Sequence, residues 1–143
     1  MTREHRMVLN ASLSELSRAR NEITLFVGAV LNPIDLSRTI ISVDEALSNV
    51  ILHGYEGRDG EIKLSIQEDD EAFTFIIDDG APPFDPLSAA PVELDDYIES
   101  DSGGGLGIDF FRRMTQTRYE RNDLGGNRLI LRKEKTHEEK SSS

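Results

Sequence analysis

Three polar side chains, Glu45, Asn49 and His53, recur at every fourth position near the middle of the sequence. Four-residue spacing places side chains on one face of an α-helix. An asparagine oxygen can complete a Mg²⁺ shell that consists mostly of water and phosphate oxygens. A glutamate one turn earlier can accept a proton from an attacking hydroxyl. Polar stripes are also ordinary on solvated helix faces, so this pattern needs a second signal.

The opposite face of the same predicted helix is apolar. It carries Leu36, Ile40, Val43, Leu47 and Val50. If this apolar face packs on the core, the polar stripe faces away from it.

A second signal lies at the end of an apolar segment, in residues 76–80 (I-I-D-D-G). A carboxylate only accepts hydrogen bonds, so a buried one can receive the exocyclic amine of adenine. Gly80 would let the backbone pass close to the base. Carboxylates also form turns at strand ends, and the residues alone leave both interpretations open.

A glycine run, residues 103–107 (G-G-G-L-G), stands directly before a predicted helix. Glycines allow close backbone approach, and a helix N-terminus offers unpaired N–H groups to phosphates. The run matches neither the P-loop nor the dinucleotide-binding pattern. A flexible hinge is the plainer interpretation of a lone glycine run.

Together and in this order, the three segments resemble the GHKL (histidine-kinase-like) ATPase superfamily. Residues 45–55 (E-A-L-S-N-V-I-L-H-G-Y) look like its N box, and residues 78–86 (D-D-G-A-P-P-F-D-P) like its first glycine box. Residues 104–108 (G-G-L-G-I) look like the second, and the loop between the two glycine boxes corresponds to the ATP lid. The H-G-Y ending of the N box and the short chain are most similar to the anti-sigma-factor serine/threonine kinases.

This resemblance implies ATP and Mg²⁺ as ligands, with Asn49 as the metal ligand and Glu45 as the catalytic base. It also implies that Asp78 accepts from the adenine amine, with Gly80 beside the base. The other residues that we expect at the nucleotide are His53, Gly104, Gly105, Leu106 and Gly107.

Such a protein would phosphorylate a serine of a small anti-sigma-factor antagonist, bind a sigma factor and form a homodimer. An alternative is a non-catalytic module that binds ATP and sequesters a regulator. Residues 81–111 contain no Lys or Arg, and this favours the alternative because phosphoryl transfer needs cationic stabilisation. A third interpretation, the catalytic half of a two-component histidine kinase, would need its phosphoacceptor helices on another chain.

The elements that would position these residues mix helices with antiparallel strands. We expect strands over residues 2–10, 61–67, 72–78, 115–121 and 127–133, helices over 13–31, 34–53 and 103–114, and a long loop over 80–102. This order predicts an α+β two-layer sandwich, in which a mixed, mostly antiparallel sheet carries helices on one face. We expect one domain over residues 1–134 and a disordered tail over 135–143.

Composition limits the class of protein. The chain has 143 residues, no cysteine and a net charge of −11. An acidic surface disfavours nucleic acid and anionic membranes and favours protein partners with basic patches. No signal peptide or apolar run of membrane-spanning length is evident, so we expect a cytoplasmic protein.

Overall fold

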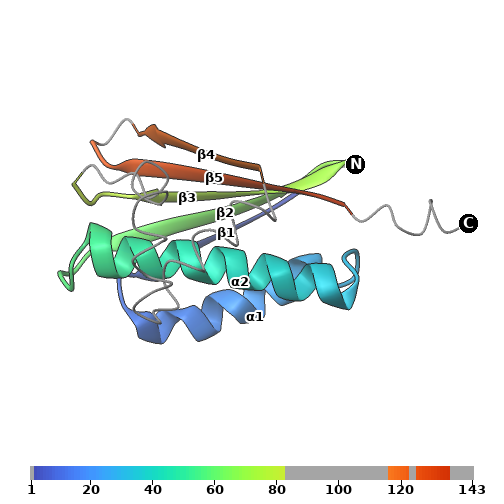
Figure 1. Ribbon diagram of the computed structural model, residues 1–143, viewed down its shortest axis with the longest axis horizontal. Coiled ribbons are helices and arrows are strands. Elements are labelled where there is room, and N and C mark those ends of the chain that lie inside the picture. Colours follow the sequence, from blue (N-terminus) through green and yellow to red (C-terminus); the bar gives the residue numbers. More distant parts are fainter. Residues whose placement is uncertain (1, 83–115, 123–124, 136–143) are drawn as a thin grey trace, which may run out of the picture.

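The computed structural model describes residues 2–82, 116–122 and 125–135, and it forms two layers. The strands form one sheet in the order β1-β2-β3-β5-β4, and both long helices cover one of its faces (Figure 1). The elements are β1 (Arg3–Asn10), η1 (Leu13–Glu15), α1 (Leu16–Val27), α2 (Pro33–Asn49), η2 (Val50–Gly54), β2 (Glu61–Glu68), β3 (Ala72–Asp79), β4 (Gln116–Arg121) and β5 (Asn127–Glu134).

The predicted α+β two-layer sandwich is confirmed. All four strand pairings in the described sheet are antiparallel, whereas we expected a mixed sheet. The lid, the glycine run and the helix predicted after it fall on residues 83–115, and most of the predicted tail on 136–143. Both segments lie outside the described residues. No helix within the described part of the chain is long and apolar enough to cross a membrane.

The first predicted helix is shorter than expected. It begins with the 3₁₀ turn η1, and α1 ends at Val27 instead of continuing to Leu31. The side chain of Ser12 caps the 3₁₀ turn by accepting from the backbone N–H of Ser14, and the carboxylate of Glu15 accepts from the backbone N–H of Asn10 at 2.9 Å. Gly28 follows as the C-cap, so the connection to α2 is only a few residues long.

Helix α2 starts at Pro33, within one residue of the start predicted from the sequence. The side chain of Asn32 accepts from the backbone N–H of Asp35 at 2.8 Å, and Pro33 occupies the first turn, where its missing N–H costs nothing. Arg20 on α1 contacts Asp44 on α2 at 2.9 Å and ties the two helices together. The α-helical geometry ends at Asn49 and gives way to the single π-helical turn η2.

Alternation along β3 decides which side chains enter the core. Phe73, Phe75, Ile77 and Asp79 point towards the helices and are buried. Asp78 therefore lies on the opposite, open face of the sheet. The core between the layers also contains Leu9, Ile23, Val27, Leu47, Ile62, Leu64, Ile66 and Leu131.

Candidate functional site

Asn49 is buried between the helix layer and the sheet, with 4% of its surface exposed. Our expectation that the whole polar stripe faces away from the core is therefore wrong for this residue. The buried arc of α2 is wider than its apolar face, because it also includes Asp35, Thr39 and Ser42. Their short side chains let the helix approach the sheet closely, and Asn49 continues this arc at the helix end.

The side-chain nitrogen of Asn49, Nδ2, is buried and has no hydrogen-bond partner within the described part of the chain. A buried polar group without a partner costs about 1–3 kcal/mol. Such orphaned groups are uncommon in folded proteins and call for an explanation. A bound ligand that accepts a hydrogen bond from Nδ2 would supply one.

Glu45 lies one helical turn before Asn49 and is partly buried. Burial raises the pKa of its carboxyl group, and the neighbouring charge of Asp44 raises it further. A carboxylate with a raised pKa is a better proton acceptor than an exposed one. The role of Glu45 as the catalytic base stays a prediction.

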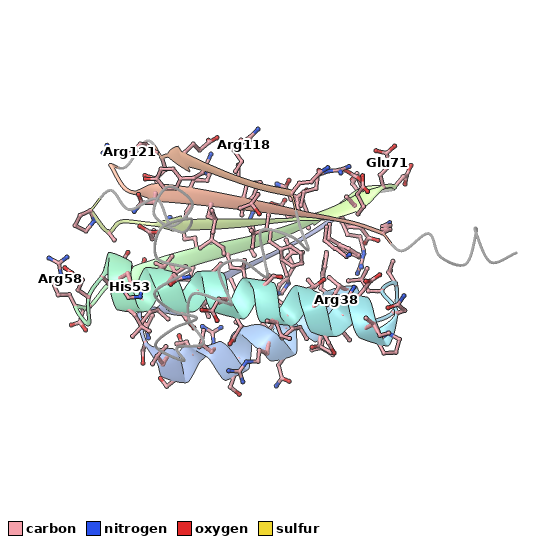
Figure 2. The ribbon with its side chains drawn as sticks, viewed as in Figure 1. Arg38, His53, Arg58, Glu71, Arg118 and Arg121 are labelled. Atoms are coloured by element: carbon pink, nitrogen blue, oxygen red, sulfur yellow. The ribbon has the colours of Figure 1, made fainter. Side chains whose placement is uncertain are left out.

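His53 does not share the environment of Asn49. It is exposed on η2, at the end of the helix layer where Arg58 also lies (Figure 2). The π turn is wider than an α-helical turn, so the four-residue spacing no longer aligns side chains beyond Asn49. The prediction that His53 contacts the nucleotide remains without support from this placement.

The two adjacent carboxylates have opposite surroundings. Asp78 is on the open sheet face, where its Oδ1 accepts from Nε of Arg128 at 2.8 Å. Asp79 faces the helix layer with 7% of its surface exposed. Burial raises the pKa of Asp79, although hydrogen bonds from Asn127 and Ala81 oppose the shift. Asp79, rather than the Asp78 predicted from the sequence, is therefore the carboxylate of the pair that faces the helix layer.

Asn127 holds Asp79 in place from the neighbouring strand. It is the cross-strand partner of Asp79, and its Nδ2 donates to Oδ1 of Asp79 at 2.9 Å. The hydroxyl of Tyr119 on β4 donates to Oδ1 of Asn127, and the same Nδ2 reaches the carbonyl of Pro82 at 3.0 Å. The carboxylate is therefore oriented before any ligand arrives.

Close backbone packing fixes the same strand end. A Cβ added at Gly126 would lie 1.9 Å from the carbonyl oxygen of Asp79, so only glycine fits there. On the helix side, a Cβ added at Gly54 would lie 3.4 Å from the Cβ of Ala81. The end of the Asn49 helix and the segment after Asp79 are thus in contact.

Sequence reasoning missed Asp79 and Asn127. The alternation of Phe73, Phe75 and Ile77 was the signal for Asp79, because it fixes the inward parity of the strand. Asn127 had no comparable signal, since its role depends on strand pairing 48 residues away in sequence. Gly104, Gly105, Leu106 and Gly107 lie outside the described residues, so their predicted contacts with phosphate stay predictions.

The described residues fit a magnesium-bound nucleotide better than a free metal ion. No group of three or more His, Cys, Asp or Glu side chains in the described ranges could hold a metal. Mg²⁺ needs few protein ligands when phosphates and waters supply the rest. Asn49 provides one side-chain amide at the end of α2, and its unsatisfied nitrogen could donate a hydrogen bond to a phosphate oxygen.

Comparison with known families agrees with this geometry. Residues 9–133 match the family model of the histidine kinase-like ATPase domain. Since the match spans most of the 143 residues, the chain belongs to that family. A comparison with curated proteins gave no match.

Proposed function

We propose that this histidine kinase-like ATPase domain binds Mg·ATP and transfers the γ-phosphoryl group to a serine or threonine of a partner protein. The observation that carries the proposal is the buried, unpartnered amide of Asn49, one turn after a glutamate whose pKa is raised. The family supports ATP as the nucleotide. The partner that we propose is a small anti-sigma-factor antagonist in a partner-switching pathway that controls transcription.

Base recognition would fall to Asp79. A carboxylate accepts from the 6-amino group of adenine, whereas guanine presents an acceptor oxygen at that position. Asn127 keeps the carboxylate aimed, because its amide already occupies Oδ1 of Asp79. Asp78 is engaged by Arg128 on the other face, so we no longer propose it as the adenine ligand.

Asn49 would ligate Mg²⁺ through its side-chain oxygen and donate from Nδ2 to a phosphate oxygen. The metal, when bound, would neutralise charge that develops on the phosphates. The glycine segment 104–107 would hold the same phosphates through its backbone N–H groups, as proposed from the sequence.

Glu45 would accept the proton of the attacking hydroxyl. The hydroxyl oxygen forms a bond to the γ-phosphorus, and the bond from that phosphorus to the bridging oxygen of ADP breaks. ADP leaves with the electron pair of that bond, and the proton remains on Glu45. A raised pKa favours this acceptance, because it brings the carboxyl closer to the pH at which the reaction runs.

The direct test uses purified protein, Mg·[γ-³²P]ATP and a purified candidate protein of the anti-sigma-factor-antagonist type. We expect label on a serine or threonine of that protein, and no label with Glu45→Gln. Absence of label under conditions where calorimetry shows bound ATP would exclude the kinase reaction for that partner.

A second candidate is an ATP-dependent binding module that sequesters a sigma factor or another regulator without turnover. The absence of Lys and Arg from residues 81–111 favours it. Arg38 is the cation on α2 nearest to Glu45 in sequence, but it lies two turns away and is exposed. Regulation that survives Glu45→Gln would support the binding module, and lost regulation would support the kinase.

A further inference from the structure

Tyr55 joins three backbone segments that border the site. Its hydroxyl donates to the carbonyl of Glu61 at the start of β2 over 2.7 Å. The same hydroxyl accepts from the backbone N–H of Gly80, directly after β3, over 2.8 Å. Tyr55 itself follows η2 and therefore ends the helix that carries Asn49.

The ring cannot easily move. Tyr55 is 7% exposed, and a Cβ added at Gly60 would lie 2.2 Å from its Cε1 atom. Its backbone N–H donates to the carbonyl of Val50 at 2.9 Å and closes the π turn. Packing around the ring and the backbone hydrogen bond thus hold the Tyr55 side chain in place independently of its hydroxyl.

The hydrogen bond from the Gly80 N–H to Tyr55 holds the peptide that follows Asp79 in place. Gly80 has no side chain of its own to anchor it, and the N–H of the next residue, Ala81, donates to Oδ1 of Asp79 at 2.9 Å. A shift of Gly80 would therefore also move the donor that helps to aim the Asp79 carboxylate.

We propose that Tyr55 is a positioning residue that sets the selectivity of the site for adenine. It does so by holding the Asp79–Gly80 peptide at a fixed place relative to the helix of Asn49. This inference rests on the proposed binding of ATP. It concerns the base end of the site, so affinity for the phosphates should not depend on it.

The test is Tyr55→Phe, which keeps the packed ring and removes only the hydroxyl. Thr24→Val is the matched control, because it removes a hydroxyl that donates to the carbonyl of Arg20 on the solvent-exposed side of α1. Calorimetric titration with Mg·ATP, Mg·GTP and Mg·tripolyphosphate measures base and phosphate recognition separately.

With Tyr55→Phe we expect the Kd for ATP to rise about tenfold, because the Asp79 carboxylate would no longer be aligned to accept a hydrogen bond from adenine. The Kd for tripolyphosphate should stay at the parent value, so the preference for ATP over GTP falls. An unchanged preference, or a parallel loss of ATP and tripolyphosphate affinity, would overturn the inference. Parent protein that binds no ATP would instead refute the proposed function itself.

Amide hydrogen exchange of the parent protein gives a test that does not depend on the folding of a variant. If the phenol holds Gly80 for the base, ATP should slow exchange of the Gly80 N–H, and tripolyphosphate should not. Equal slowing by both ligands, or by neither, would contradict the role of Tyr55.

Discussion

Replacing either member of the Asp78–Asp79 pair by asparagine separates two assignments of the adenine ligand. The two changes are chemically identical and one residue apart. Asp79→Asn alters a buried carboxylate on the helix-facing side of β3, and Asp78→Asn alters one that pairs with Arg128 on the open face. Only the first should affect the nucleotide.

The expected magnitude follows from the two environments. A hydrogen bond to a charged group contributes about 1.5–3 kcal/mol, so Asp79→Asn should raise the Kd for ATP about 10- to 150-fold. An asparagine can also turn its amide towards the oxygen of guanine, so discrimination against GTP should fall. The pair of Asp78 with Arg128 is partly exposed and contributes at most about 1 kcal/mol to stability, with no effect on ATP expected.

The assay is calorimetric titration of ATP and GTP into each variant, with thermal unfolding as the check on folding. The pH dependence gives a second reading, because burial raises the pKa of Asp79. ATP affinity should fall as the pH is lowered through that raised pKa, and the fall should be absent in Asp79→Asn. The reasoning is refuted if Asp78→Asn weakens ATP binding and Asp79→Asn does not.

Three further variants test other parts of the site, and a fourth, Gly57→Ala, serves as a control. Asn49→Ala should raise the Kd for Mg·ATP at least about tenfold, and the rise should be smaller in EDTA, where only the hydrogen bond from Nδ2 to phosphate is lost. It should not lower the free energy of unfolding as a core truncation would, because it removes an orphaned amide. A markedly less stable variant would argue that Nδ2 has a partner. Glu45→Gln should lower kcat about 10²- to 10⁴-fold with ATP affinity intact. Its free energy of unfolding should rise slightly at a pH above the raised pKa of Glu45, where the parent's carboxylate is ionised although burial disfavours that form. This gain should vanish below the unfolded-state pKa of Glu45. Gly126→Ala should unfold the start of β5 and abolish ATP binding, because the new Cβ would clash with the carbonyl of Asp79. Gly57→Ala is the control, since Gly57 has a positive φ of 81° but open space around it. It should lower the free energy of unfolding by only about 1 kcal/mol and leave ATP binding unchanged.

The sequence was sufficient for most of the described elements and for the layers they form. The expected helix starts at residues 13 and 34 lie within one residue of the starts of η1 and α2, and all five expected strands agree with the observed ones to within one residue at each end. It failed where geometry departs from the regular periods. The π turn after Asn49 separates His53 from the stripe. The inward position of Asp79, in contrast, follows the regular alternation of β3 and could have been predicted from the sequence. Neither the turn nor the cross-strand bond of Asn127 follows from local spacing.

The described site concentrates groups that cost the folded protein free energy when no ligand is present. Asn49 leaves an amide unsatisfied, and burial raises the pKa values of Glu45 and Asp79 because it disfavours their ionised forms. All three lie towards the end of α2 or at the strand end packed against it. A ligand that accepts from Asn49 and donates to Asp79 removes two of these costs at once, and this gain appears as a lower Kd. Binding then stabilises the fold by about 2.7 kcal/mol at 100 times that Kd. Mg·ATP should therefore raise the melting temperature more than Mg·tripolyphosphate at equal ligand concentration, because only the nucleotide reaches Asp79. An equal rise of the melting temperature with both ligands would show that the adenine base does not contact Asp79 at the end of β3.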